Sequence, residues 1–353
     1  MEKNSKPKKI ALITGCGMDA KTLTHFLLSK NYHVVMTYRR NSSSNPVDLK
    51  ELFAEDLKNN PQSSFSLEFC DITDSASVAK CVELILGTLG EIDEVYALAA
   101  QSHVGNSFDN PVYTINATGM GAYNLFECLR HLAPKCRIYQ ASTSEMFGGD
   151  VKNNPFSEKS PFECRSPYSV AKNLAYNWVK YFRQTYGMFI SSGFLFNHSN
   201  IYRGHDFFIR HVTSSAAKIA LGKIDFFTVG NLKHYRDEHL SDFGVEAMYK
   251  MLQLDFPIDL VIGNGNAQFG EDYLNYAFGY FNLDWTKYAK FDQNKIRPNE
   301  VVKLVADPRK AVETIGWIPN RIPFSDHIKL MCERDYDLEK GLKHKRVDVF
   351  SLY

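Results

Sequence analysis

A tyrosine and a lysine stand four residues apart in the segment SPYSVAKN, as Tyr168 and Lys172. Residues with this spacing share one face of an α-helix, so the ammonium group would lie beside the phenol. A nearby positive charge favours the phenolate, which could then take a proton from a sugar hydroxyl group. The competing interpretation is an amphipathic helix with a core tyrosine and an exposed lysine, because this spacing is frequent by chance.

A second candidate chemical group lies in the segment QASTSEMFGG, which closes the apolar stretch CRIYQ. Thr143 and Glu145 follow the end of this predicted buried strand. The hydroxyl of Thr143 could hold a substrate oxygen. A simple hydride-transfer site built around a tyrosine has no evident use for a carboxylate, so Glu145 indicates an additional acid–base step.

A glycine-rich turn lies upstream of these residues, where ITGCGMDA links the strand-like run KIALITG to a predicted helix. Gly15, Gly17 and Ala20 have the spacing G-x-G-x-x-A. Glycine allows a tight turn and a close approach to a pyrophosphate, to which the helix N-terminus offers N–H groups. The strand–turn–helix context favours a dinucleotide site over a plain glycine turn.

The end of the second predicted strand, TYRRN, indicates which dinucleotide would bind. An NAD site usually offers an acidic residue there to the ribose 2′-hydroxyl group, whereas this chain has Arg39 and Arg40. Two guanidinium groups suit a 2′-phosphate, so the pair favours NADP over NAD. The alternative is that the two arginines are a solvent-exposed basic pair that binds no cofactor. Asp71, after LEFC, is placed to contact the adenine, although aspartate also starts turns.

The elements that must position these residues alternate between apolar runs of strand length and segments of helical periodicity. This pattern predicts an α/β fold with a Rossmann-type, doubly wound parallel sheet. We expect an NADP-binding domain over residues 1–197, with a returning core strand near 258–265, and a smaller, interleaved substrate-binding domain over 198–353. Helices are expected at about 167–186, 206–221, 239–253 and 270–281.

Composition excludes several classes of protein. With 41 Lys+Arg against 40 Asp+Glu, the net charge of +1 indicates neither a nucleic-acid nor an anionic membrane partner. No run reaches the ~20 apolar residues of a membrane helix, and the short N-terminal apolar run reads as a first strand and not as a signal peptide. Seven scattered cysteines without a CxxC pair indicate no disulfide framework and no metal site. We therefore expect a cytoplasmic protein.

Several motifs together resemble the extended short-chain dehydrogenase/reductase family, and within it the branch of GDP-mannose 4,6-dehydratases. The similarity covers about residues 9–330 and includes YRRNSSSN, SPYSVAK, YRGHDFFIRHVT and RPNEV. The segments AQSHV, QASTSE and FNH in combination are specific to this branch. The resemblance implies an NADP-dependent lyase in nucleotide-sugar metabolism that acts on a GDP-sugar and assembles as a homotetramer.

The implied reaction answers the question raised by the carboxylate. Such enzymes oxidise C4 of the hexose, eliminate water across C5 and C6, and return the hydride to C6. Oxidation at C4 makes the C5 proton acidic, so Glu145 can remove it and assist the departure of hydroxide. Thr143 would bind the C4 oxygen, Tyr168 would take its proton, and Lys172 would also hold the nicotinamide ribose.

The resemblance also implies the binding residues. Cofactor contacts would come from Gly15, Gly17, Met18, Asp19, Ala20, Arg39, Arg40, Asn41, Ser42, Asp71, Ile72, Leu98, Ala99, Ala100, Gln101, Ser102, Tyr113, Lys172, His198 and Arg203. Substrate contacts would come from Ser102, Asn197, His211, Arg236, Arg297 and Glu300. The arginines in the second set suit a diphosphate, which they can bind through paired N–H groups.

Three departures from the family pattern keep alternatives open. The glycine loop TGCGMDA is one residue short, His211 replaces a common lysine, and Glu238 stands where a tryptophan is expected. These changes lie in binding elements and leave the four catalytic candidates intact. A GDP-manno-heptose substrate is therefore one alternative. A nucleotide-sugar epimerase or C4 dehydrogenase is another, and a non-catalytic NADP-binding scaffold is the last.

Overall fold

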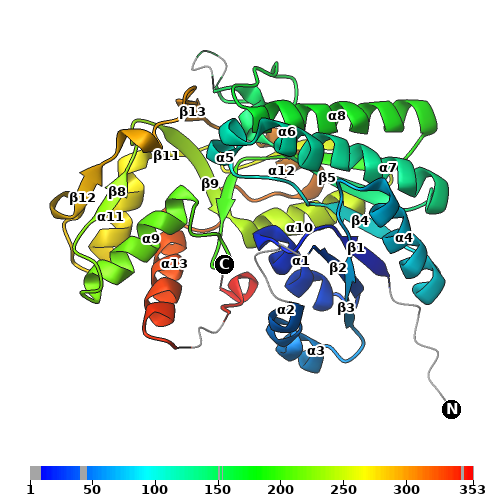
Figure 1. Ribbon diagram of the computed structural model, residues 1–353, viewed down its shortest axis with the longest axis horizontal. Coiled ribbons are helices and arrows are strands. Elements are labelled where there is room, and N and C mark those ends of the chain that lie inside the picture. The colour runs from blue at the N-terminus through cyan, green and yellow to red at the C-terminus, as the bar shows by residue number, and fades with distance from the viewer. Residues whose placement is uncertain (1–8, 40–45, 150–151, 153, 343–345, 353) are drawn as a thin grey trace. The chain divides into compact units, whose positions relative to one another are not determined.

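The computed structural model describes residues 9–39, 46–149, 152, 154–342 and 346–352 (Figure 1). The chain forms two compact units that interleave along the sequence. Unit 1 comprises Met1–Ser142, Pro167–Gly193 and Val245–Asp259, and unit 2 comprises Thr143–Ser166, Phe194–Gly244 and Leu260–Tyr353. The chain thus passes between the units at residues 142, 166, 193, 244 and 259. The sequence predicted a boundary after residue 197, with a strand near 258–265 that returns to the first domain.

A seven-stranded sheet forms the centre of unit 1, and the carboxyl ends of three of its strands continue into unit 2. Its order is β10–β6–β5–β4–β1–β2–β3, and the pairs β1–β2, β2–β3, β1–β4 and β4–β5 are parallel. This arrangement confirms the predicted doubly wound sheet and its returning strand. The strands are β1 (Ile10–Ile13), β2 (His33–Tyr38), β3 (Ser64–Phe69), β4 (Glu94–Ala97), β5 (Arg137–Thr143), β6 (Ile190–Leu195) and β10 (Asp259–Ile262).

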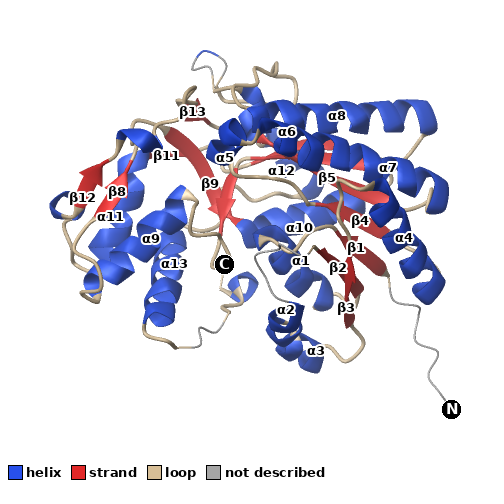
Figure 2. Ribbon diagram, viewed as in Figure 1, coloured by secondary structure: helices blue, strands red, loops and turns tan. Residues whose placement is uncertain are grey.

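Helices flank this sheet (Figure 2). Apolar side chains of α4, α7 and α8 share one buried cluster with strand residues such as Leu12, Val95 and Ile138. The inner strands β1 and β4 are buried along their whole length, as expected where both faces of a sheet are covered, whereas the edge strand β3 is only partly buried. The helices are α1 (Met18–Leu28), α2 (Pro46–Leu52), α3 (Ala54–Asn59), α4 (Ser75–Leu89), α5 (Val104–Asp109), α6 (Pro111–Thr114), the π-helix η1 (Ile115–Met120), α7 (Gly121–Leu132), α8 (Pro167–Tyr186) and α10 (Ser241–Leu252).

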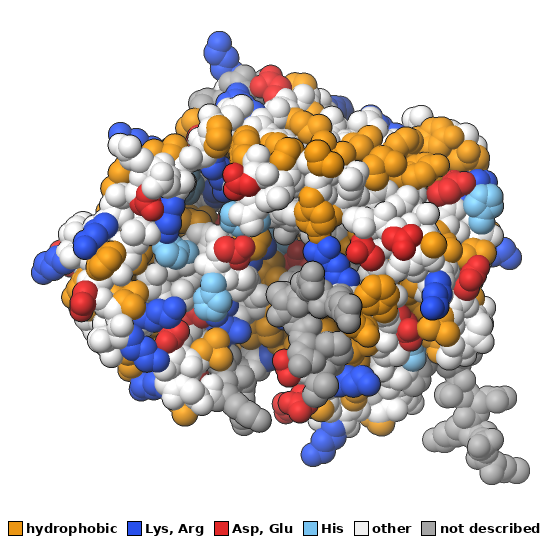
Figure 3. All heavy atoms as spheres, in the orientation of Figure 1, with side chains coloured by type: hydrophobic (Ala, Val, Ile, Leu, Met, Phe, Trp, Pro, Cys, Tyr) orange, Lys and Arg blue, Asp and Glu red, His pale blue; other side chains and the backbone are white. Residues whose placement is uncertain are grey.

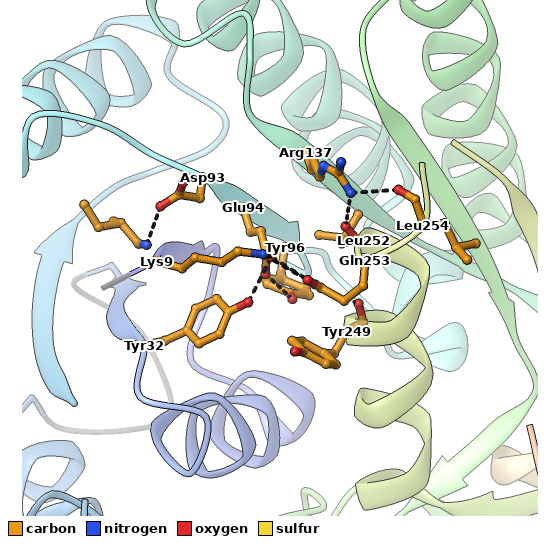
Figure 4. Close-up of polar contacts among 11 residues, drawn as sticks. Lys9, Tyr32, Asp93, Glu94, Tyr96, Arg137, Tyr249, Leu252, Gln253 and Leu254 are labelled. Carbon is orange, nitrogen blue, oxygen red and sulfur yellow. Dashed lines mark hydrogen bonds and ion pairs between the residues drawn. The ribbon is translucent and has the colours of Figure 1, made fainter. Parts of the chain in front are cut away.

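A buried carboxylate at the amino end of β4 joins three parts of unit 1 (Figure 4). Glu94, only 1% exposed, accepts hydrogen bonds from the hydroxyls of Tyr32 (3.0 Å) and Tyr96 (2.8 Å). Lys9 Nζ (3.1 Å) and Gln253 Nε2 (2.9 Å) complete the cluster. Because Gln253 follows α10, these bonds hold the C-terminal end of that helix on the sheet.

Unit 2 contains a smaller mixed sheet, in which β9 pairs with β7, β11 and β13. The register places Asn197 opposite Glu238 and His198 opposite His239. Two further strands, β8 and β12, pair in parallel. The strands are β7 (Asn197–Ser199), β8 (Phe227–Val229), β9 (Tyr235–Leu240), β11 (Ala267–Phe269), β12 (Ala289–Phe291) and β13 (Lys303–Leu304).

Helices α9, α11 and α13 enclose the apolar core of unit 2, which contains Val212, Leu274 and Ile328. The helices expected near 167–186, 206–221, 239–253 and 270–281 are confirmed as α8, α9, α10 and α11. No helix within the described residues has the length and apolar character that crossing a membrane requires. The helices of this unit are the 3₁₀-helix η2 (Ser144–Phe147), α9 (Phe208–Ala220), α11 (Gly270–Tyr280), α12 (Arg309–Ile315), α13 (Phe324–Glu339) and the 3₁₀-helices η4 (Trp285–Lys287), η5 (Gln293–Lys295) and η6 (Val349–Ser351).

Candidate active site

The glycine loop of unit 1 lies between β1 and α1. Gly15 adopts φ +84°, and a Cβ atom there would lie 3.4 Å from the Cα atom of Ala99. Gly17 is the N-cap of α1, and a Cβ atom built on it meets no atom within 4 Å. The shortened loop therefore still presents a helix N-terminus beside open space, with Met18, Asp19 and Ala20 in the first turn.

The loop after β4 is held against the glycine loop by one threonine. Thr14 Oγ1 accepts hydrogen bonds from the N–H groups of Leu98 (3.0 Å) and Ala99 (3.1 Å). The side chain of Gln101 bonds to the backbone of His103 and to Thr114 Oγ1. The segment that begins at Leu98, predicted to contact the cofactor, therefore lies against the glycine loop. The Gln101 side chain, however, forms its hydrogen bonds within the protein.

Three of the residues predicted at the adenosine end of the cofactor lie together in unit 1. The Arg39 guanidinium carbon lies 5.5 Å from the centre of the Tyr113 ring. Burial acts to raise the pKa of Asp71, but hydrogen bonds from Thr73 and the charge of Arg39 bring it below its ordinary value. Arg40, Asn41 and Ser42 lie outside the described residues.

The tyrosine and lysine of the first motif are both buried on α8. Helix α8 begins at Pro167, whose fixed φ suits a first helical turn. Lys172 Nζ lies 5.9 Å from the centre of the Tyr168 ring and donates a 2.7 Å hydrogen bond to the carbonyl of Ala141. Burial lowers the pKa of Lys172 to about 8, and the negative charge of Asp19 partly opposes this shift. The ammonium is therefore fixed beside the phenol ring.

The other two catalytic candidates belong to unit 2. Thr143 is the last residue of β5, and Glu145 lies in the 3₁₀-helix η2 that follows it. The Glu145 N–H donates to Thr143 Oγ1 at 3.3 Å, and both side chains are about nine-tenths buried. Gly148 ends the 3₁₀-helix at φ +74°, and a Cβ atom there would lie 2.1 Å from the Glu163 carbonyl oxygen. Glycine is therefore required at the turn that orients Glu145.

The predicted substrate residues of unit 2 include a group of opposite charges. Glu300 Oε1 lies 3.6 Å from Arg236 Nη2 and 3.7 Å from Arg297 Nη1. Burial lowers the pKa of Arg236, and the negative charge of Glu145 is the largest opposing effect. Arg236 is thus attracted by the carboxylates of Glu300 and Glu145 and repelled by the neighbouring Arg297. Asn197 lies on β7, the neighbour of the strand that carries Arg236.

Other predicted binding residues are partly engaged by protein groups. His211 Nε2 lies 2.8 Å from the carbonyl oxygen of Thr228, which also accepts from Lys295 Nζ at 3.0 Å. Burial is the main reason that the pKa of His211 is lowered, and the charge of Lys295 adds to it. His198 stacks on His239 with ring centres 5.3 Å apart, and Arg203 lies 3.5 Å from the centre of the Phe207 ring.

Sequence reasoning missed two groups that meet these residues. Lys295 contacts His211 from a segment 84 residues away, and Tyr273 reaches Glu238 across 35 residues. Neither contact has a local signal, because the pairing of short strands and loops in unit 2 brings the partners together. Within the residues that the structure describes, no group of three or more His, Cys, Asp or Glu side chains could hold a metal ion.

Comparison with known proteins identifies the family. The family model for GDP-mannose 4,6 dehydratase matches residues 12–331. The chain belongs to the GDP-mannose 4,6-dehydratase family. Its relatives include GDP-mannose 4,6 dehydratase 2 of Arabidopsis thaliana, 38% identical over 343 residues, covering 96% of this chain and 90% of the relative. The Homo sapiens GDP-mannose 4,6 dehydratase is 36% identical over 358 residues, covering 94% of this chain and 93% of the relative.

Solved structures share the fold at lower identity. DesIV, the dTDP-glucose 4,6-dehydratase of Streptomyces venezuelae with NAD and TYD bound, has a TM-score of 0.79 at 19% identity. It aligns over 94% of this chain and 98% of its own. RMD from Pseudomonas aeruginosa complexed with NADPH has a TM-score of 0.75 at 16% identity, over 94% and 100% of the two chains. These likenesses agree with the Rossmann-type sheet that the sequence predicted.

Proposed function

We propose that the protein is an NADP-dependent lyase that converts GDP-mannose to GDP-4-keto-6-deoxymannose. The observation that carries this proposal is the buried Glu145 beside Thr143 at the end of β5. A dehydratase needs a carboxylate there and a simple dehydrogenase does not. Membership of the dehydratase family supports the same conclusion.

A nicotinamide dinucleotide fits the residues of unit 1. The N-terminus of α1 offers N–H groups and a positive dipole to a pyrophosphate, and the space beside Gly17 is open. Arg39, exposed beside Tyr113, would attract a 2′-phosphate, which supports NADP over NAD. DesIV, solved with NAD, and RMD, solved with NADPH, share this fold, which is consistent with a cofactor of this class.

The first step requires removal of the hydroxyl proton at C4. The bound nicotinamide would accept the hydride from C4 and later return it to C6. Tyr168 takes the hydroxyl proton, because the Lys172 ammonium lies beside its ring and favours the phenolate. Thr143 donates its hydroxyl proton to the developing C4 carbonyl, and this leaves its oxygen able to accept from the Glu145 N–H.

The second step is elimination across C5 and C6. The C4 ketone acidifies the C5 proton, and the Glu145 carboxylate removes it. The same carboxyl group then protonates the departing C6 hydroxyl, so water leaves and Glu145 returns to its starting form. When the hydride returns to C6, C5 takes up one proton, and the proton that Tyr168 received from the C4 hydroxyl balances this uptake. The opposite charges of Arg236 and Glu145 attract each other. Arg236 and Arg297 can also bind the substrate diphosphate, with Glu300 between them.

The direct test is mass spectrometry of GDP-mannose after incubation with the purified protein and NADP. The product should have lost one water, and the total NADP should be unchanged at the end. Net accumulation of NADPH would indicate a C4 dehydrogenase instead. GDP-manno-heptose remains the second candidate substrate because a buried carboxylate, Glu238, lies on the strand that carries Arg236. Turnover rates with the two sugars would decide between them.

We also infer a homotetramer, and the surface of unit 1 supports an association between copies. Apolar side chains gather over α8 in Figure 3. Val170 and Tyr181, which lie about three turns apart and therefore on one face of this helix, are each more than 40% exposed. An exposed apolar helix face of this kind marks an association surface. The polar loop RRNSSSNPVDL, which in the family that the chain resembles reaches the cofactor site of a neighbouring subunit, lies largely outside the described residues. A cytoplasmic location stays a prediction.

A further inference from the structure

Lys295 is an exposed lysine of unit 2 whose backbone is held in place. It ends the 3₁₀-helix η5, which follows β12. The Asp292 N–H donates to the Val229 carbonyl at 2.8 Å, and a Cβ atom on Gly230 would lie 2.9 Å from the Lys295 carbonyl oxygen. The main chain of Lys295 thus packs directly against the end of β8. Because the backbone is already ordered, a ligand that binds the side chain orders only the side chain.

The ammonium group of Lys295 keeps donors for a ligand. The Thr228 carbonyl accepts from Lys295 Nζ at 3.0 Å and from His211 Nε2 at 2.8 Å. Because His211 Nε2 donates to this carbonyl, it does not accept from Lys295, although the two nitrogens lie 3.3 Å apart. An ammonium has three N–H groups, so two of those on Lys295 bond to no residue that the structure describes.

Helix α9 places this lysine near the strand that carries the predicted substrate residues. Phe208 and His211 lie three residues apart on α9 and therefore on one face of the helix. Lys295 lies beside His211, and Phe208 packs against His234 with ring centres 5.3 Å apart. His234 comes two residues before Arg236, at the start of β9. Lys295 therefore lies on the side of α9 that faces the beginning of β9.

The charges around His234 leave little positive charge for a diphosphate. Burial lowers the pKa of His234 to about 3, and the charges of Arg236 and Arg297 add to this effect, so the imidazole is neutral. Glu300 lies 3.6 and 3.7 Å from the two guanidinium groups, and Glu145 also attracts Arg236. Two carboxylates thus balance the two arginines. The diphosphate of a nucleotide sugar carries two negative charges, so it calls for a further cation.

We propose that Lys295 binds a diphosphate oxygen of the GDP-sugar and supplies the positive charge that the two arginines lack. Its two remaining N–H groups are the donors. Partial burial lowers the pKa of Lys295 and Asp292 opposes this shift, so a bound anion would further favour the ammonium form. The inference rests on the proposed function, because it takes Arg236 and Arg297 as substrate residues. It adds a binding residue that no sequence motif contains.

The test is Lys295→Met, followed by calorimetric binding of GDP-mannose, GDP and NADP. Methionine keeps the apolar stem of the side chain and removes the charge. The Kd values for GDP-mannose and GDP should both rise about 10- to 150-fold, because both ligands lose one charge-assisted contact. The Kd for NADP should stay unchanged. Added KCl should weaken GDP binding to the wild type more than to the variant, because salt screens the contact that the variant lacks.

Two further substitutions separate the charge of Lys295 from its hydrogen bond to Thr228. Lys295→Gln keeps an N–H donor without the charge and should lose affinity for GDP as Lys295→Met does. Lys295→Arg keeps the charge and should retain both the affinity and its salt dependence. The matched control is Lys290→Met, which alters an exposed lysine of β12 that lies 3.5 Å from the centre of the Phe226 ring. This control should bind all three ligands as the wild type does.

Three outcomes would overturn the inference: wild-type affinity for GDP in Lys295→Met, wild-type affinity in Lys295→Gln, or a loss of affinity for NADP as large as that for GDP. Wild-type turnover of GDP-mannose is measured alongside by mass spectrometry. Dehydration by the wild type together with unchanged GDP binding in the variants refutes only the role of Lys295. Absence of dehydration by the wild type refutes the proposed function itself.

Discussion

Lys172 Nζ donates a hydrogen bond of 2.7 Å to the backbone carbonyl of Ala141. This bond ties helix α8 to β5, the strand that ends at Thr143. A buried lysine held by one carbonyl cannot turn freely, so its charge stays beside the ring of Tyr168. The same burial makes the ammonium costly, which is why the pKa of Lys172 falls to about 8.

This lowered pKa predicts a pH dependence of stability. Between pH 8 and 10.5 the unfolded chain binds a proton at Lys172 that the folded protein does not, so stability contributed by this group rises with pH. The Lys172→Met variant should lack this rise. Over the full window the wild type should gain about 3 kcal/mol relative to the variant, measured by urea unfolding at a series of pH values.

Lys180→Met, on the same helix, is the control for loss of a lysine from α8. If the stability curves of the wild type and Lys172→Met run parallel between pH 8 and 10.5, Lys172 is not a strongly buried base. The variant should also have lost activity, because no ammonium remains to favour the phenolate of Tyr168.

The cofactor preference is tested at Arg39. Arg39→Ala removes a guanidinium beside Tyr113 and should weaken NADP binding about 10- to 150-fold by loss of one charge-assisted contact. NAD has no 2′-phosphate, so its affinity should change little. Fluorescence titration of both cofactors measures the difference. Arg309→Ala, which alters an exposed arginine paired with Asp307, should leave both affinities unchanged, and equal losses at Arg39 would refute the NADP assignment.

The parts of this protein that sequence patterns predicted are local ones. Apolar runs predicted most of the parallel strands, because the inner strands of a sheet that is covered on both faces are largely apolar. The i, i+4 spacing gave the relation of Tyr168 to Lys172, because one helix carries both residues. The glycine spacing likewise predicted a turn that lies between β1 and α1.

The contacts that sequence patterns could not predict join distant segments. Ala141 is 31 residues from Lys172, and Glu300 reaches Arg236 through the packing of a loop near β9. The parallel pairing of β7 with β9 places Asn197 beside Glu238, and strands of three to six residues carry too few side chains to specify their partners. The buried Glu94 cluster likewise depends on Gln253, which is 159 residues away.

The Glu94 cluster predicts a stability effect separate from catalysis (Figure 4). Glu94→Ala would leave the hydroxyls of Tyr32 and Tyr96 and the Lys9 ammonium without their shared acceptor. Removing one member of a buried charged network should lower the free energy of unfolding by about 3–5 kcal/mol. Because Glu94 lies at the amino end of β4, the activity of the folded fraction should persist. Urea unfolding provides the measurement, with the exposed Glu83→Ala as control.

The exposed apolar face of α8 predicts which substitution should dissociate the tetramer. Val170→Asp places a charge among the apolar side chains of this face, beside neither Tyr168 nor Lys172 on the helical wheel. Light scattering should find a tetramer for the wild type and smaller species for the variant. Val312→Asp, at an exposed valine of α12, should remain a tetramer. A wild type that is only a 40.3 kDa species at micromolar concentration with cofactor present would refute the assembly.

The sharpest prediction separates the two halves of the reaction at Glu145. Glutamine is nearly isosteric with glutamate and can still form hydrogen bonds, but it cannot take the C5 proton. Glu145→Gln should therefore bind substrate, complete the oxidation at C4 and stall, with elimination slowed about 10²- to 10⁴-fold. Enzyme-bound NADPH should accumulate, visible in a single-turnover absorbance trace, and solvent deuterium should not enter C5.

Tyr168→Phe provides the contrast, because its loss blocks the first proton transfer. That variant should form no NADPH, although the ring keeps its packing on α8 beside Lys172. If Glu145 only shaped the pocket, Glu145→Gln would slow oxidation and elimination alike and no NADPH would build up. Product formation by Glu145→Gln at the wild-type rate would show that another group removes the C5 proton, and the dehydratase mechanism proposed for Glu145 would be wrong.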